Sequence, residues 1–412
     1  MSALPSFLQA RQIVLEHARS LATTDTEIVD LVSATGRALA EDISADRDFP
    51  PFDRATRDGF AVRAADVASV PARLRVTGEI RAGAAPSQSS CALNAGEAVE
   101  IMTGAPLPPG ADAVVMVEHT ARNGEFVIIQ RKLIARENVV PRGAEARMNE
   151  VLIGAGAQLG PEQIAVVAAT GHSRARVYQK PRIAVLSTGD EVVDVAATPG
   201  PNEIRNSNAY ALAAQIEMAS GDAAILPIAP DKPEQLRKLV EEGLASDLLL
   251  LSGGVSMGKH DLVEAALQEL GAEFFFTGAE IQPGRPIVFG RAPRTGAAVT
   301  KTYFFGLPGN PISTMVCFEI FARAMVEALA GRQPSRLKTA VARLAEDLKV
   351  KTGLTRFLPA VITGEFSEAA VAPVKWQGSG DVAAAARGNC WLVVPPDRDL
   401  LKAGEAVSVL FR

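Results

Sequence analysis

The sequence has few cysteines, few histidines and no long apolar run, and each shortage excludes a class of protein. Its three cysteines, Cys91, Cys317 and Cys390, lie far apart and form no CxxC pair, so we expect buried thiols rather than a disulfide framework or a zinc site. The four histidines are scattered, which disfavours histidine-based chemistry. No stretch approaches the roughly 20 consecutive apolar residues of a membrane span, and the start has no signal-peptide pattern. A cytoplasmic location without a membrane partner is therefore expected.

The charge and composition indicate a folded, multidomain protein. A formal net charge of -5 and a pI near 5.6 leave no basic stripe for a phosphate backbone, so nucleic acid is not an expected partner. Hydrophobic residues make up 48% and charged residues 22% of the 412 residues, a mixture that builds packed cores. At roughly 150 residues per domain, this length predicts two to four domains.

The hydrophobic pattern changes several times along the chain. Residues 6–22 have the spacing of an amphipathic helix, and residues 46–147 carry short apolar runs cut by proline and glycine, as in a β-rich domain. Further on, strands and helices alternate, which predicts a parallel sheet covered on both faces. A glycine and proline break at residues 331–334 is followed by short strands again. The expected strands of the alternating region are 183–186, 223–228, 248–251 and 303–306, and the expected helices are 209–219, 233–244, 262–270 and 312–329.

Three glycine-containing loops follow expected strands of the parallel sheet: residues 187–191 (STGDE), 252–258 (SGGVSMG) and 307–311 (LPGNP). Ligands of such sheets bind beyond the carboxyl ends of the strands, and glycines let the backbone approach an anion closely. The GxGxxG and GxxxxGK[ST] motifs are absent, which disfavours dinucleotide-binding and P-loop interpretations. The loop residues that we assign to substrate binding are Gly189, Asp190, Ser252, Gly253, Gly254, Ser256, Gly258, Pro308, Gly309 and Asn310.

Carboxylates accompany these loops. Asp190, Glu191 and Asp261 lie in or beside them, and Asp231 precedes the expected helix 233–244. Carboxylates beside an anion site fit a Mg²⁺ ion that bridges them to phosphate oxygens. Two structural alternatives stay open, because Asp231 with Glu234 has the spacing of a capping box and Asp261 could be a plain helix N-cap.

Two further motifs complete a resemblance to a known family. Residues 50–63 (PPFDRATRDGFAVR) and 101–105 (IMTGA), together with the three loops, resemble molybdopterin molybdenumtransferases of the MoeA and gephyrin type. The resemblance implies a multidomain α/β fold around a central parallel-sheet α/β domain of the molybdopterin-binding type. The implied domains are a discontinuous helical domain (1–45 and 148–178), an inserted β-rich domain (46–147), the α/β domain (179–331) and a C-terminal β-barrel domain (332–412).

The resemblance also implies a reaction, in which molybdate is inserted into adenylyl-molybdopterin and AMP is released with the help of Mg²⁺. Its site lies between the α/β domain of one subunit of an elongated homodimer and the inserted domain of the other. Two further partners to consider are the adenylyltransferase, which makes the substrate, and the molybdoenzymes, which receive the finished cofactor. The matching catalytic positions are Asp58, Thr103, Glu191, Asp231 and Asp261, of which the last three would bind Mg²⁺, and Ser379 matches a substrate-binding position.

The sequence departs from this family at several positions where the family has a lysine or an arginine. Gly278 and Gln282 stand where lysines are frequent, Pro359 stands where an arginine is frequent, and Glu145 replaces an aspartate. Arg285 and Lys259 are the available substitutes, and we assign Arg285 to substrate binding, the alternative being an exposed surface arginine. Losing charge-assisted contacts weakens anion binding unless other cations compensate.

Two other functions remain to be considered. Adenylyl transfer to molybdopterin would need only the α/β domain, and would leave the Asp58 motif and both β domains unexplained. A diverged member that binds cofactor intermediates or acts as a scaffold, without full catalysis, would account for the missing lysines.

Overall fold

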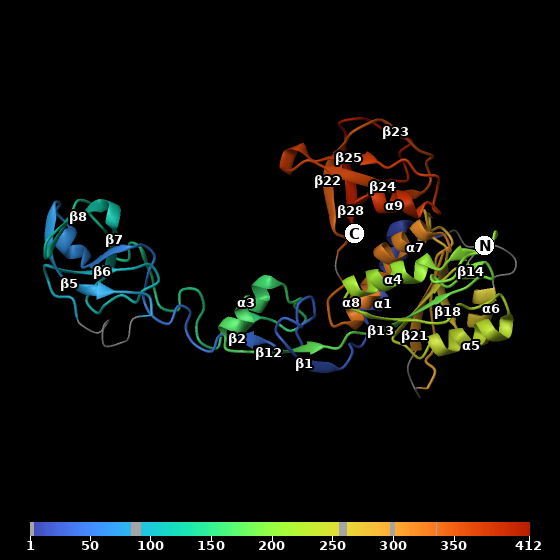
Figure 1. The fold of residues 1–412 in the computed structure, drawn as a ribbon, viewed down its shortest axis with the longest axis horizontal. Coiled ribbons are helices and arrows are strands. Elements are labelled where there is room, and N and C mark those ends of the chain that lie inside the picture. Colours follow the sequence, from blue (N-terminus) through green and yellow to red (C-terminus); the bar gives the residue numbers. More distant parts are fainter. Residues whose placement is uncertain (1–3, 84–91, 255–261, 297–300, 335) are drawn as a thin grey trace. The chain divides into compact units, whose positions relative to one another are not determined.

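The computed structural model describes residues 4–83, 92–254, 262–296, 301–334 and 336–412. The chain forms two compact units (Figure 1). Unit 1 comprises Met1–Ala40, Gly156–Gly160 and Arg176–Arg412, and unit 2 comprises Glu41–Ala155 and Pro161–Ala175. The finer division into four domains stays a prediction. None of the helices in the described ranges is long and apolar enough to cross a membrane.

The central sheet of unit 1 has six strands in the order β16-β13-β17-β21-β20-β18. The first four are parallel, as predicted, but β20 pairs antiparallel with both β21 and β18, so the sheet is mixed. Only residues 294–300 join β20 to β21, which is too short for the crossover that a parallel pair needs. The strands are β13 (Arg182–Ser187), β16 (Asp222–Ile225), β17 (Leu248–Ser252), β18 (Glu273–Thr277), β20 (Val288–Pro293) and β21 (Lys301–Leu307).

Helices cover both faces of this sheet, because the inner strands point apolar side chains to both faces. Ile183 and Leu248 pack in the core of one face, whereas Ala184 and Leu249 pack in the core of the other. All four side chains are fully buried. The first face carries α1 (Phe7–Arg19), α4 (Ser207–Met218), α7 (Pro311–Cys317), a π-helical turn (Phe318–Ala322) and α8 (Arg323–Leu329), and the second carries α5 (Pro233–Gly243) and α6 (Leu262–Glu269).

The C-terminal part of unit 1 is a closed barrel. Its ring runs β24-β25-β22-β28-β26 and closes where β26 pairs with β24, so the predicted barrel is confirmed. The short strand β19 (Ile281–Gln282) pairs with β24 and joins the barrel to the α/β part. Cys317 and Cys390 are buried free thiols, as expected, and Cys91 lies outside the described residues. The barrel strands are β22 (Thr339–Leu344), β24 (Thr355–Thr363), β25 (Ala370–Pro373), β26 (Cys390–Val394) and β28 (Ala406–Phe411), accompanied by β23 (Leu348–Lys349), β27 (Leu400–Leu401) and α9 (Val382–Arg387).

Unit 2 is built mainly of strands, as the sequence indicates. Its largest sheet has the order β7-β4-β6-β5-β9-β8, and two short antiparallel pairs, β2–β11 and β3–β10, accompany it. Helix α3 (Pro161–Ala169) begins at the proline that predicted it. The six main strands are β4 (Gly59–Val62), β5 (Ala72–Ile80), β6 (Glu97–Ile101), β7 (Ala113–Met116), β8 (Thr120–Asn123) and β9 (Phe126–Ile129); the short ones are β2 (Ile43–Ser44), β3 (Arg54–Ala55), β10 (Val139–Val140) and β11 (Val151–Ile153). A further two-stranded sheet, of β1 (Thr26–Asp30) and β12 (Arg174–Tyr178), belongs mostly to unit 1.

Candidate functional site

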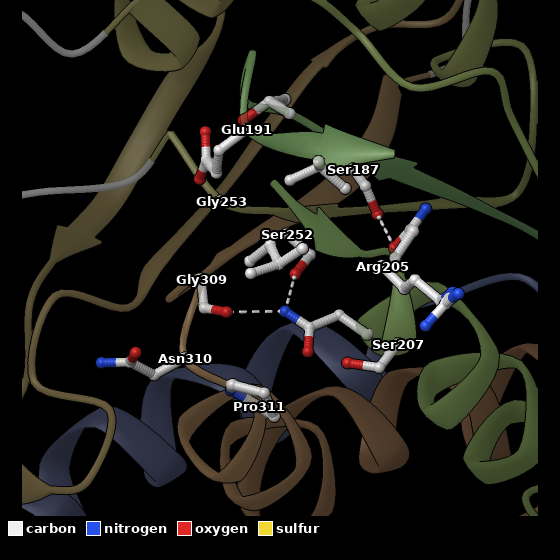
Figure 2. A pocket seen from close by; sticks show the side chains of 14 residues that line it. Ser187, Glu191, Arg205, Ser207, Ser252, Gly253, Gly309, Asn310 and Pro311 are labelled. Carbon is white, nitrogen blue, oxygen red and sulfur yellow. Dashed lines mark hydrogen bonds between the residues drawn. The ribbon is translucent and has the colours of Figure 1, made fainter. Parts of the chain in front are cut away.

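The carboxyl ends of β13, β17 and β21 border a cavity of about 300 Å³ (Figure 2). Each of the three predicted loops contributes to its wall, through Glu191, through Ser252 and Gly253, and through Gly309 and Asn310. This is the edge of a parallel sheet at which ligands are expected. Ser187, Thr188 and Pro311 of the same loops line it as well, and the remaining wall consists of Val192 and residues 204–208.

Two glycines shape these loops. Gly189 has φ +133, and a Cβ atom there would lie 2.5 Å from Oε2 of Glu191. Gly253 has φ +92, and its Cβ would lie 2.6 Å from the carbonyl oxygen of Thr188. L-residues rarely adopt such φ values, and both contacts are shorter than real Cβ atoms show. Any side chain at 189 would therefore displace the Glu191 carboxylate.

The N-terminus of α4 joins the three strand ends. Its N-cap, Asn206, accepts hydrogen bonds from the Ser187 hydroxyl at 2.9 Å and from the Ala209 N–H at 3.2 Å. Two residues on, Asn208 donates to the Ser252 hydroxyl oxygen at 2.9 Å and to the Gly309 carbonyl at 2.7 Å (Figure 2). Sequence reasoning did not find these two asparagines. The available signal was an asparagine directly before an apolar helical run, which is typical of an N-cap.

The predicted carboxylates occupy neighbouring positions. Glu191 lines the cavity, and Oδ1 of Asp190 accepts a hydrogen bond of 3.0 Å from the backbone N–H of Asp231. The capping-box alternative for Asp231 is wrong, because α5 begins at Pro233 with Lys232 as an N-cap that has no side-chain bond. Ser256, Gly258, Lys259 and Asp261 lie outside the described residues, so their roles stay predictions. Among the residues that are described, no group of three His, Cys, Asp or Glu side chains could hold a metal ion.

A second cavity, of about 500 Å³, lies between the α/β part and the barrel of unit 1. Of the predicted residues, Arg285, Pro308, Asn310 and Ser379 line it, and Gln282 lines it as well. Asn310 borders both cavities. Arg285 is an exposed residue and forms no ion pair within the described part of the chain. It is therefore free to bind an anion in this cavity.

The structure gives a physical reason for the missing lysine at Gly278. This glycine has φ +145, and a Cβ atom would lie 2.8 Å from Cδ2 of Leu4. A lysine would need both a strained backbone and a displaced Leu4 side chain. Gln282, in contrast, is exposed, so a lysine fits there without repacking.

Asp58 and Thr103, predicted from separate motifs, are in direct contact in unit 2. Oδ1 of Asp58 accepts hydrogen bonds from the Thr103 backbone N–H at 2.6 Å and from its hydroxyl at 2.8 Å. These bonds lower the pKa of the Asp58 carboxyl below its usual value, the backbone N–H having the larger effect. Glu145 pairs with Arg54 at 2.7 Å. Asp58 is thus held as an oriented anion.

Replacing Thr103 by Ala should raise the pKa of Asp58 towards its usual value, because the hydroxyl donor is lost while the backbone donor remains. The carboxyl ¹³C chemical shift of Asp58, followed by NMR as a function of pH, measures this change. Thr120→Ala is the matched control, since that hydroxyl donates to the Val117 carbonyl instead. An Asp58 titration that is identical in Thr103→Ala and in the parent would contradict the assignment of the hydroxyl bond.

Comparison with known proteins agrees with this geometry. The chain matches the MoeA N-terminal region (domain I and II) over residues 6–171, the family described as "Probable molybdopterin binding domain" over 184–328, and the MoeA C-terminal region (domain IV) over 341–411. It is 33% identical to the molybdopterin molybdenumtransferase of Bacillus subtilis over 94% of this chain and 90% of the relative. The chain belongs to the MoeA family. It is also 37% identical to the same enzyme of a Nostoc species, over 74% of this chain and 70% of the relative.

Solved structures of the MoeA family share the whole fold. The molybdopterin biosynthesis MoeA protein of Pyrococcus horikoshii superposes with a TM-score of 0.72 and 32% identity, covering 97% of this chain and 98% of that one. The curated relatives are named as transferases, so this MoeA-family chain is an enzyme of molybdenum cofactor biosynthesis. Its first cavity lies wholly within the region that extends from Ser187 to Pro311, which the molybdopterin binding domain match spans.

Proposed function

We propose that the chain inserts molybdate into adenylyl-molybdopterin and releases AMP in a Mg²⁺-dependent step. The observation that carries the proposal is the cavity where the three strand-end loops meet, inside the region that matches a molybdopterin binding domain. Serine and threonine residues, two glycines and the N-terminus of α4 line it, and such a lining suits a phosphate-bearing ligand.

Two of the described carboxylates are available to bind a Mg²⁺ ion. Among the described residues, neither the Glu191 nor the Asp231 carboxylate is occupied by a hydrogen bond or an ion pair. Free carboxylate oxygens beside a phosphate site are the ligands that this hard cation prefers. We propose Glu191 and Asp231, with Asp261, as the residues that would hold it. Bound there, Mg²⁺ would neutralise charge on the phosphate oxygens while the protein residues orient them.

The second cavity would receive the molybdate oxyanion. Arg285 supplies a permanent positive charge and two parallel N–H donors, and Ser379 and Asn310 supply polar groups beside it. We propose that these residues bind molybdate. Asp58 and Thr103 would serve the same reaction from a second copy of the chain, as the homodimer of the family resemblance implies.

Arg285→Ala should raise the molybdate concentration needed for half-maximal rate by about tenfold, since losing about 1.4 kcal/mol corresponds to that factor in affinity. Gln282→Lys should leave this concentration unchanged or lower it. AMP release measured against molybdate concentration gives both values. Arg237→Ala, which removes an exposed arginine of α5, is the control. Equal molybdate requirements in Arg285→Ala and the parent would make Arg285 an ordinary surface residue.

The proposed reaction is tested by incubating the purified chain with adenylyl-molybdopterin, Mg²⁺ and molybdate. AMP should appear only when all three are present. Formation of adenylyl-molybdopterin from molybdopterin and ATP would instead support the adenylyl-transfer alternative, although that activity leaves the matched N-terminal and C-terminal regions without a role. Ligand binding without any turnover would support a scaffold.

A further inference from the structure

The side chain of Asn208 holds two of the strand-end loops together. Its Nδ2 donates to Oγ of Ser252, at the end of β17, and to the carbonyl of Gly309, after β21. The orientation of the amide is fixed, because a carbonyl oxygen can only accept and the atom 2.7 Å from it must be the nitrogen. The other end of the amide is therefore its carbonyl oxygen, Oδ1.

That oxygen is buried and has no hydrogen-bond partner among the described residues. The same is true of the hydroxyl oxygen of Thr188, a residue that is 3% exposed. Both residues line the first cavity. Burying an acceptor without a donor is unfavourable, so native proteins rarely leave one unpaired. The two oxygens belong to residues that line one cavity, and a ligand with N–H groups can supply the donors that they lack.

We infer that Asn208 and Thr188 recognise an N–H-bearing nitrogen heterocycle, with Asn208 also positioning the two loops around it. This inference rests on the proposed function, because adenylyl-molybdopterin carries two such rings, the pterin and the adenine. An amide oxygen can only accept, so it selects ring N–H and amino groups over ring nitrogens that lack hydrogen. The phosphates then lie against the loop backbones, where no side chain is needed.

Direct binding tests this inference without requiring turnover. The affinities of the full-length chain for AMP and for molybdopterin are measured separately by calorimetry, since AMP carries only the adenine and molybdopterin only the pterin. Asn208→Ala should weaken the binding of the ligand whose ring occupies the cavity by about tenfold and leave the other unchanged. Thr188→Val, which is nearly isosteric, should weaken the binding of the same ligand.

Gln215→Leu is a matched control. Gln215 lies on the same helix, donates through Nε2 to the Met315 carbonyl at 3.1 Å, and also has an unpaired buried oxygen, but it does not line the cavity. The Gln215→Leu variant should bind both ligands as tightly as the parent does. A purely structural role would lower the melting temperature of Asn208→Ala and Gln215→Leu alike, without a ligand-specific loss.

Unchanged affinity for both ligands in Thr188→Val and in folded Asn208→Ala would overturn the inference. If Asn208→Ala does not fold, the Thr188→Val measurement decides alone. A parent chain that binds either ligand in this manner but never releases AMP would contradict the proposed function and leave the recognition intact. The two failures are thus distinguishable.

Discussion

Glu191→Gln is expected to lower the rate of AMP release by about a hundredfold or more, because the substitution removes a proposed Mg²⁺ ligand while keeping the shape of the side chain. The fold should be retained, since the carboxylate has no hydrogen-bond or ion-pair partner within the described residues. Initial rates at saturating adenylyl-molybdopterin and molybdate measure the effect. Circular dichroism and the melting temperature report on the fold.

Glu203→Gln is the control for this substitution. Glu203 belongs to the same segment between β13 and α4, but its carboxylate accepts a hydrogen bond from the Gly200 N–H and does not line the cavity. Mg²⁺ titrations add a second readout, because a lost metal ligand should shift the half-saturating Mg²⁺ concentration upwards. Full activity of Glu191→Gln at ordinary Mg²⁺ would remove Glu191 from the site.

Mixing two inactive variants should restore activity, which is the second large effect. In a homodimer whose sites take Asp58 from one subunit and Glu191 from the other, a heterodimer of Asp58→Ala and Glu191→Ala contains one intact site and one doubly altered site. Free exchange of equal amounts makes half of the dimers mixed, so about a quarter of the parent activity should return. Rates are measured before and after exchange, which native mass spectrometry verifies.

Each variant taken alone through the same exchange procedure is the control and should stay inactive. If verified heterodimers show no more activity than the single variants, both groups act within one chain. The proposed sharing of the site between subunits would then be wrong.

The strand-end loops could be predicted because their signals are local. The Leu248–Ser252 strand is apolar on both faces, so its end, and the glycines that follow, mark the ligand edge of a parallel sheet. The reversed direction of β20 was not predicted, because an apolar run does not encode direction and only the short connection from β20 to β21 does. Asp231 illustrates the same limit, since a capping-box spacing does not determine where the helix begins.

The role of Asn208 depends on tertiary structure. Its two partners, Ser252 and Gly309, lie 44 and 101 residues away in sequence, and no periodicity relates them. Likewise, the absence of a lysine at Gly278 was apparent from the sequence, but its cause, the Leu4 side chain against a left-handed backbone, was not. Motifs indicated which loops matter, and packing determined which neighbouring side chains hold them.

A single-turnover experiment tests metal insertion most directly. The purified chain is loaded with adenylyl-molybdopterin and supplied with Mg²⁺ and molybdate; AMP is quantified by chromatography, and molybdenum bound to the pterin product is quantified by elemental analysis. The account predicts one AMP released for each molybdenum incorporated, and neither product in Glu191→Gln. AMP release that proceeds equally without molybdate, or a product that contains no molybdenum, would contradict it.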